Sequence, residues 1–270
     1  MNVDRPAHAS IAQIRASQDF SGTAIPLSRY VEVPAAWPLT WLLLRAGCGP
    51  NAVTAMRLGM GLLALPLIAQ PQLYLHWFGL IAFAVSLVLD QVDGQICRVK
   101  NQASYFGKFF DGVADAFTEI PLPVVLGLHV WLRDGAVSSL IAGFVASAVL
   151  ALIYITLLRY GLLANWVQAT APDAPVSHHP KLRRFLDTQP MAGIGQFVNV
   201  RMPLILSDLR YGGLIVAVVF DSLGLYLVLF CILHAAALAL LAPLRLLDAY
   251  DRFDIHRLSR TAANRPSSNS

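Results

Sequence analysis

Charged residues are scarce in this sequence. Lys, Arg, Asp and Glu make up 13% of its 270 residues, whereas 56% of the residues are hydrophobic and the mean hydropathy is +0.58. Because soluble domains carry about 25% charged residues, this composition excludes an ordinary soluble domain. It predicts an all-α, polytopic membrane protein.

Cysteine is scarce as well, and several sequence patterns are missing. Cys48, Cys97 and Cys231 are scattered and odd in number, so no disulfide framework is expected. Residues 1–28 hold no apolar run that could serve as a secretory signal, and we find neither heptads nor internal repeats. These absences favour one membrane domain with polar ends.

The apolar runs predict a membrane helical bundle with six transmembrane helices and an N-terminal interfacial helix. Residues 37–46 are too short to cross a membrane, and Trp37, Trp41 and Arg45 fall four apart, as in a helix at the membrane interface. We expect spans at about 51–70, 73–98, 104–131, 136–158, 207–220 and 222–244. We expect three regions, namely a polar cytosolic N-terminal segment, one membrane domain and a polar cytosolic tail, at residues 1–36, 37–245 and 246–270.

Four aspartates stand out against this apolar background. Asp90 and Asp93 lie at the end of the second predicted span, about 60° apart on a helix, and Asp111 and Asp115 lie about 40° apart in the third. Each pair therefore shares a helix face. A tight turn at the polar residues 101–102 would fold the two helices into a hairpin and bring all four carboxylates together.

Four neighbouring carboxylates need positive charge between them. One such residue alone would usually be a helix cap or part of a solvated face, but intramembrane acids are costly and rarely without function. Like charges this close cannot all stay ionised unaided. Divalent cations bind to oxygen ligands, and Mg²⁺ keeps positions open for substrate phosphate. We therefore expect a metal-bound phosphate or pyrophosphate.

The aspartate stretch also resembles a family signature. From Asp90 to Asp115 it reads D-x2-D-G-x2-C-R-x8-G-x3-D-x3-D. This resembles the signature of the CDP-alcohol phosphatidyltransferase family, integral membrane enzymes that make phospholipids from cytidine-diphosphate-linked donors. Cys97 stands where the family usually has Ala, and because Cys is small and apolar we expect it to be tolerated.

A second, shorter pattern precedes the signature. Asn51, Thr54 and Arg57 form N-x-x-T-x-x-R, which resembles the start of the family's first membrane helix. They lie on one side of the predicted helix, from which they could reach nucleotide or phosphate. Asn51 could equally be a helix N-cap.

The resemblance implies roles for the signature residues. Gly94 would allow close approach of the nucleotide, Arg98 would pair with donor phosphate, and Gly107 would be permissive like Gly94 or would simply allow helix packing. The general base that takes the acceptor's hydroxyl proton would be Asp115. Two divalent cations, Mg²⁺ or Mn²⁺, would be bound by the four carboxylates of Asp90, Asp93, Asp111 and Asp115.

The reaction implied is transfer of a phosphatidyl group from CDP-diacylglycerol to the hydroxyl of a polar alcohol, with release of CMP. Arg159, Arg201 and Arg210, at helix ends expected to face the cytosol, favour a phosphorylated acceptor such as glycerol 3-phosphate or inositol phosphate, although each could equally anchor the chain at the interface. Glu119 could support the metal ligands or cap a polar cavity. The family also implies a homodimer within membrane lipids and no nucleic-acid partner.

Two other functions stay open at this point. Transfer from CDP-choline or CDP-ethanolamine to diacylglycerol would use the same signature. A cation transporter could use the aspartates as an ion path, but it would not need Gly94, Arg98 and Gly107 at these spacings, and transporters commonly show internal repeats.

The distribution of basic residues predicts the orientation. With the N-terminus inside, nineteen of the 20 Lys and Arg residues fall in cytosolic segments or at cytosolic helix ends, the exception being Arg133. By the positive-inside rule, both termini and the aspartate hairpin face the cytosol. In a bacterium this would be the inner membrane.

Overall fold

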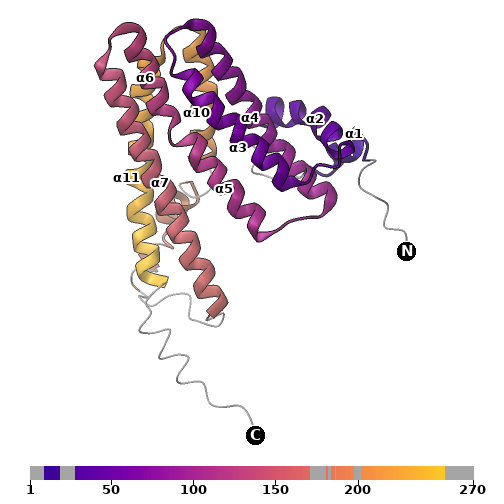
Figure 1. The fold of residues 1–270 in the computed structure, drawn as a ribbon. Helices are drawn as coiled ribbons and strands as arrows, with labels where there is room; N and C mark the ends of the chain where they lie inside the picture. Colours follow the sequence, from indigo (N-terminus) through magenta and orange to yellow (C-terminus); the bar gives the residue numbers. More distant parts are fainter. Residues whose placement is uncertain are drawn as a thin grey trace, which may run out of the picture. The chain divides into compact units, whose positions relative to one another are not determined.

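The computed structural model describes residues 9–18, 28–170, 181, 184–185, 187–197 and 202–252. Regular structure within these residues is helical throughout, and no strand is found among them (Figure 1). The elements are α1 (Ile11–Ala16), the π-helix η2 (Ser28–Glu32), α2 (Val33–Arg45), α3 (Pro50–Ile68), α4 (Leu73–Lys100), α5 (Tyr105–Glu119), α6 (Leu122–Asp134), α7 (Val137–Thr170), α9 (Gln189–Gln196), α10 (Met202–Val219) and α11 (Leu223–Arg252).

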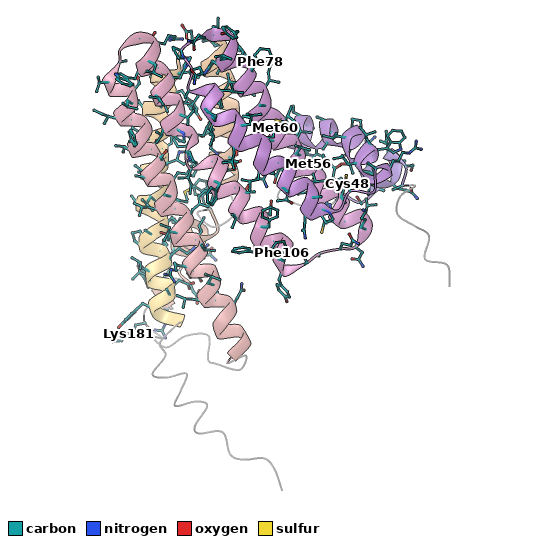
Figure 2. The ribbon with its side chains drawn as sticks, viewed as in Figure 1. Cys48, Met56, Met60, Phe78, Phe106 and Lys181 are labelled. Carbon is teal, nitrogen blue, oxygen red and sulfur yellow. The ribbon has the colours of Figure 1, made fainter. Side chains whose placement is uncertain are left out.

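The helices confirm an all-α integral membrane protein. Many apolar side chains point away from the helices, among them Met56, Phe78 and Phe106, each at least half exposed (Figure 2). Such exposure is expected where hydrocarbon is the solvent. Among the described residues, five helical segments are long and apolar enough to cross a membrane, so the count of six stays a prediction; the five are Pro50–Ile68, Leu73–Lys100, Tyr105–Asp134, Val137–Asn165 and Leu223–Tyr250.

The observed helix boundaries differ from the predicted spans in two ways. The predicted third span is broken after Glu119, because Pro123 in the first turn of α6 has no N–H to donate to the Glu119 carbonyl. A kink from this proline and Pro121 was expected. In contrast, α7 and α11 continue well beyond residues 158 and 244, since hydropathy marks the apolar part of a helix and not the end of its hydrogen bonding.

The chain divides into two compact units. One comprises residues 1–148 and 204–232, and the other comprises residues 149–203 and 233–270. Within the second unit, the hydroxyl of Tyr160 donates to Asp248, and the guanidinium of Arg245 lies 4.2 Å from the centre of the Tyr160 ring. The aspartates and the cavity described below all belong to the first unit.

Helix α3 is the centre of the first unit, because it packs against α4 on one side and α5 on another (Figure 1). Its contact with α5 is close: a Cβ on Gly61 would stand 2.4 Å from the Cγ2 atom of Thr118. Any larger residue at Gly61 would push the helices apart. Side chains on α3 can therefore reach both aspartate-bearing helices.

Helix α2 determines which way α4 faces. The buried hydroxyl of Thr40 donates to Oε1 of Gln95 at 2.6 Å, and Nε2 of Gln95 donates to the carbonyl of Val33 at 3.3 Å. Gln95 lies about 200° around the helix from Asp93. Anchoring Gln95 to α2 thus turns Asp93 towards α3, and apolar packing supports this arrangement through Ile14, Ala36, Leu44, Val53, Leu89, Val92 and Ile96.

The turn between α4 and α5 lies where the polar residues predicted it. Asn101 ends α4 in the left-handed conformation, with φ 49° and ψ 46°, which Asn tolerates better than most residues. Ser104 then begins α5, because its Oγ accepts a 2.9 Å hydrogen bond from the Gly107 amide. One end of the turn is therefore made by the backbone conformation of Asn101 and the other by the side chain of Ser104.

Candidate active site

Three of the four predicted aspartates meet in one group. One carboxylate oxygen from each of Asp90, Asp93 and Asp111 lies within 4.8 Å of the others. Asp93 is buried, whereas Asp90 and Asp111 are partly exposed. Three carboxylates offer hard oxygen ligands and no sulfur or imidazole, so the donor set fits Mg²⁺ or Mn²⁺.

Asp115 joins this group through Arg57. The guanidinium of Arg57 contacts three carboxylates: Nη1 lies 2.7 Å from Oδ1 of Asp90 and 2.6 Å from Oδ1 of Asp111, and Nη2 pairs with Oδ1 of Asp115. The arginine is almost fully buried, at 3% exposed. The sequence assigned Arg57 to nucleotide or phosphate, and the structure places it among the aspartates.

Thr54 binds Asp93, the one of the four carboxylates for which no Arg57 contact is described. Its hydroxyl lies 2.7 Å from Oδ2 of Asp93 and 3.2 Å from the carbonyl of Pro50. Because the carboxylate is the closer and the charged acceptor, it is the stronger partner. Thr54 and Arg57, one turn apart on α3, therefore orient all four aspartates between them.

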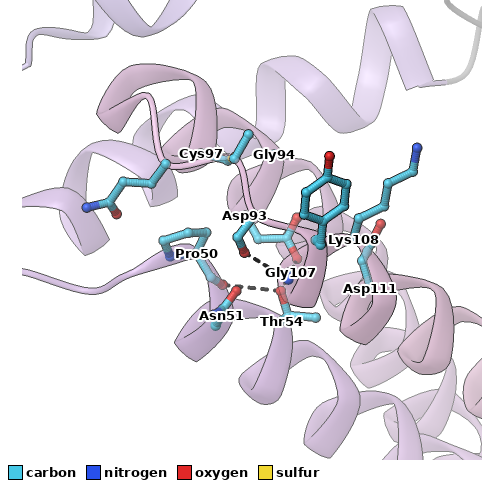
Figure 3. Close-up of a pocket in the computed structure, with 13 residues that line it drawn as sticks. Pro50, Asn51, Thr54, Asp93, Gly94, Cys97, Gly107, Lys108 and Asp111 are labelled. Atoms are coloured by element: carbon cyan, nitrogen blue, oxygen red, sulfur yellow. Dashed lines mark hydrogen bonds between the residues drawn. The ribbon is translucent and has the colours of Figure 1, made fainter. Parts of the chain in front are cut away.

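A cavity of about 540 Å³ opens beside the aspartates (Figure 3). Asp93 and Asp111 form part of its wall, and the rest of the lining comes from the start of α3, the end of α4 and the turn into α5. Four of the predicted nucleotide or phosphate residues line it, namely Asn51, Thr54, Gly94 and Gly107. Cys97 lines it as well.

Lys108 also lines this cavity, although it gave no signal of its own in the sequence. It directly follows Gly107, and it is the one lysine among the residues that line the cavity, to which it brings a positive charge. Only its position next to a signature residue could have singled it out.

The two signature glycines have different surroundings. A Cβ on Gly94 would meet only the Arg98 guanidinium, at 3.5 Å or more, so the space beyond it belongs to the cavity. A Cβ on Gly107 would stand 3.0 Å from Oγ of Ser104 and 3.1 Å from Oδ1 of Asn51. Gly107 thus allows α5 to begin close to α3. Arg98 itself donates from Nη2 to Oε1 of Gln18 at 2.9 Å.

Of the three predicted acceptor arginines, Arg210 lies in the same unit as the aspartates. Its Nη1 lies 2.6 Å from Oε2 of Glu119, and the hydroxyl of Tyr211 donates to Oε1 of the same glutamate at 2.5 Å. Glu119 is thus the anchor of α10 on α5, one turn beyond Asp115. Arg159 belongs to the second unit, and Arg201 lies outside the described residues.

Taken together, the helices and the site define a membrane protein with a cluster of carboxylate oxygens that could hold a divalent cation next to a cavity. Residues 48–242 match the CDP-alcohol phosphatidyltransferase family. This match covers well over half of the chain, so the protein belongs to that family, whose members transfer substituted phosphate groups. The resemblance of the aspartate signature is thereby confirmed.

One named relative matches part of the chain. It is the CDP-diacylglycerol–glycerol-3-phosphate 3-phosphatidyltransferase of Cereibacter sphaeroides, which is 37% identical over 92 residues. The match covers 31% of this chain and 40% of the relative. The chain therefore spans about two fifths of the length of that protein.

Proposed function

We propose that this protein is a metal-dependent CDP-alcohol phosphatidyltransferase. It would transfer a phosphatidyl group from CDP-diacylglycerol to the hydroxyl of a polar alcohol, phosphorylated or not, and release CMP. The observation that carries the proposal is that Asp93 and Asp111 form part of the wall of a cavity which residues of both family patterns also line.

The cavity would take the cytidine diphosphate part of the donor. Gly94 leaves open space at the wall, and Asn51 and Lys108 offer an amide and an ammonium group to nucleotide or phosphate. Arg98 lies beside Gly94, where a guanidinium could pair with donor phosphate. These cationic groups would offset part of the charge that two phosphates bring into an acidic site.

The aspartates would hold the pyrophosphate through divalent cations. Asp90, Asp93 and Asp111 supply the ligands that lie close together, and Asp115 is the fourth ligand that the signature implies. Two bound Mg²⁺ or Mn²⁺ ions would neutralise phosphate charge and stabilise the departing CMP. Thr54 would orient the Asp93 carboxylate for this purpose.

Asp115 would act as the general base. It would accept the proton of the acceptor hydroxyl, whose oxygen attacks the phosphorus nearer the diacylglycerol. The new oxygen–phosphorus bond forms as the bond from that phosphorus to the bridging oxygen of the pyrophosphate breaks. The bridging oxygen leaves with CMP.

The acceptor would lie on the Asp115 side of the cluster. Glu119 and Arg210 are the charged residues one turn further along α5 and on the helix bonded to it. Arg159 and Arg201 stay predicted acceptor residues on the ground of the sequence alone. The name of the Cereibacter sphaeroides relative makes glycerol 3-phosphate the first acceptor to try.

Orientation and assembly complete the proposal. The aspartates, the cavity and both termini would face the cytosol, where CDP-linked donors and Mg²⁺ are available. The active form would be a homodimer in the membrane. Thiol labelling of single-cysteine variants in intact cells would test the orientation, and chemical cross-linking in native membranes would test the dimer.

The decisive experiment is CMP release by the purified protein in detergent with CDP-diacylglycerol and Mn²⁺. The acceptors to compare are glycerol 3-phosphate, inositol phosphate, inositol, serine and choline. Acceptor-dependent CMP release would support the proposal and identify the product. If none of these acceptors works, while CDP-choline or CDP-ethanolamine with diacylglycerol does, the donor assignment is wrong. No CMP release in any combination of donor and acceptor, together with no binding of CDP, would overturn the proposed function.

A further inference from the structure

Arg57 contacts two of the three carboxylates that could hold a divalent cation. Its Nη1 atom lies 2.7 Å from Oδ1 of Asp90 and 2.6 Å from Oδ1 of Asp111. Both aspartates belong, with Asp93, to the group whose ligand atoms lie within 4.8 Å of one another. The Arg57 side chain is 3% exposed, whereas the side chains of Asp90 and Asp111 are 31% and 44% exposed, so an ion can still reach the two carboxylates.

A guanidinium and a divalent cation cannot both stay close to these two carboxylates at low cost. Asp90 and Asp111 would hold a cation through their oxygens, and Nη1 already lies within 2.7 Å of one oxygen of each. Two positive charges on the same carboxylates repel each other, most strongly where the guanidinium is buried. Cation binding thus requires Arg57 to give up at least one of its contacts.

We propose that Arg57 competes with the divalent cation for Asp90 and Asp111 and so sets the metal affinity of the site. The inference rests on the proposed function only in taking this aspartate group as the metal site. Arg57 keeps a partner when it yields, because Nη2 is paired with Asp115, which lies outside the group of three. Its movement therefore leaves no buried guanidinium without a counter-charge.

The same competition links metal binding to donor binding. A donor phosphate next to the aspartates offers the displaced guanidinium an anionic acceptor, in a geometry that arginine recognises well. The donor nucleotide should then raise the affinity for the cation, and the cation should raise the affinity for the nucleotide by the same factor. Arg57 is the residue through which part of this coupling passes.

The test is Mn²⁺ binding by the full-length protein in detergent, measured from the electron paramagnetic resonance signal of free Mn²⁺, with no acceptor and no turnover. Arg57→Gln removes the competing charge while keeping an amide of similar reach, and should bind Mn²⁺ roughly tenfold more tightly. Arg57→Lys keeps the charge but loses the two-armed guanidinium, so its Mn²⁺ affinity should lie between those of the wild type and Arg57→Gln. Equal or weaker binding by Arg57→Gln would overturn the proposal, since Arg57 would then only order the ligands.

The coupling is tested by repeating the titration with CDP. CDP should tighten Mn²⁺ binding by a smaller factor in Arg57→Gln than in the wild type. An equal factor would remove Arg57 from the coupling. Arg133→Gln is the matched control, because Arg133 also bridges two carboxylates, Asp134 and Asp221, and should leave Mn²⁺ affinity unchanged.

Two further outcomes separate this proposal from the proposed function. If Arg57→Gln does not fold, the Mn²⁺ affinity of Arg57→Lys tests the proposal instead. An affinity no tighter than that of the wild type would overturn the proposed competition. Wild-type protein that binds no Mn²⁺ overturns both proposals. Protein that binds Mn²⁺, gains affinity in the variants and releases no CMP overturns the proposed function alone.

Discussion

The hydroxyl of Thr54 donates a 2.7 Å hydrogen bond to Oδ2 of Asp93, a residue on another helix and 39 positions further along the chain. Asp93 is the buried member of the aspartate group. A carboxylate taken out of water needs such a donor, because an unsatisfied buried charge is costly. In the N-x-x-T-x-x-R pattern, Thr54 lies one turn before Arg57 on the same side of α3, and both residues reach aspartates from that side.

Replacing Thr54 by Val should therefore damage the site. The variant keeps the shape of the side chain and removes the donor, so we expect a loss of about 1–3 kcal/mol in stability and roughly tenfold weaker Mn²⁺ binding. Thermal unfolding and a Mn²⁺ titration measure the two effects. Thr118→Val is the control, since the Thr118 hydroxyl bonds only to carbonyls of its own helix. Unchanged Mn²⁺ affinity in Thr54→Val would show that Asp93 does not depend on this donor.

Asp115→Asn should abolish turnover and spare the fold. The amide cannot accept the hydroxyl proton, so CMP release should fall by at least about 10²-fold. Asp90, Asp93 and Asp111 still lie together, so Mn²⁺ binding should survive, although weakened. A variant that keeps full activity would exclude Asp115 as the base.

Removal of divalent cations should stop the reaction. Exhaustive chelation should reduce acceptor-dependent CMP release to background, because the carboxylates alone repel the donor pyrophosphate. Activity should return with Mg²⁺ or Mn²⁺, whose preferred ligands are oxygen. Undiminished activity after chelation would contradict the metal-dependent mechanism.

Cys97 provides a direct test of the nucleotide cavity. Its side chain lines the cavity next to Gly94, and the protein is otherwise free of thiols there, since Cys48 and Cys231 are not part of the lining. In a Cys48→Ser/Cys231→Ser background, CDP should slow alkylation of Cys97 severalfold, because bound nucleotide would cover it. The rate is read by mass spectrometry. A triple mutant that adds Asp93→Asn to this background serves as control and should lose most of the protection. Alkylation that ignores CDP would place the nucleotide elsewhere.

Glu119→Gln should destabilise the first unit. Both carboxylate oxygens are bound, one by Arg210 and one by Tyr211, and both partners of the ion pair are nearly buried. Breaking such a pair from one side costs about 3–5 kcal/mol, since the nearly buried Arg210 loses this counter-charge. The exposed pair of Arg133 with Asp221 is the comparison, and Arg133→Gln should cost no more than about 1 kcal/mol. Thermal unfolding distinguishes the two, and equal small losses would mean that Arg210 finds another partner.

Much of the fold was predictable because the signals are local. A long apolar run predicts a membrane helix wherever it lies, Asn101 and Gln102 predict the turn between α4 and α5, and Pro121 and Pro123 predict a kink, which the structure shows as a break after Glu119. The lengths of α7 and α11 were not predictable in this way, because polar residues continue a helix as well as apolar ones once it has begun.

Parts of the site were less accessible to sequence reasoning. The aspartates could be paired by helical periodicity, but the partners of Thr54 and Arg57 depend on how α3 lies between α4 and α5. Lys108 had no pattern of its own. Arg210 and Glu119 pair although they are 91 positions apart in the sequence, and no spacing rule connects positions so distant.

The sequence by itself determined the class of this protein. Scarce charge and long apolar runs predict a membrane protein, and four aspartates at helical spacing within the D-x2-D-G signature predict a bound cation, because both predictions follow from the cost of placing charge in hydrocarbon. Only the tertiary structure decided which carboxylates share an oxygen site and which are held by Arg57. The physical reason is that periodicity determines the face on which a side chain lies, whereas its partner depends on the helix packed against that face.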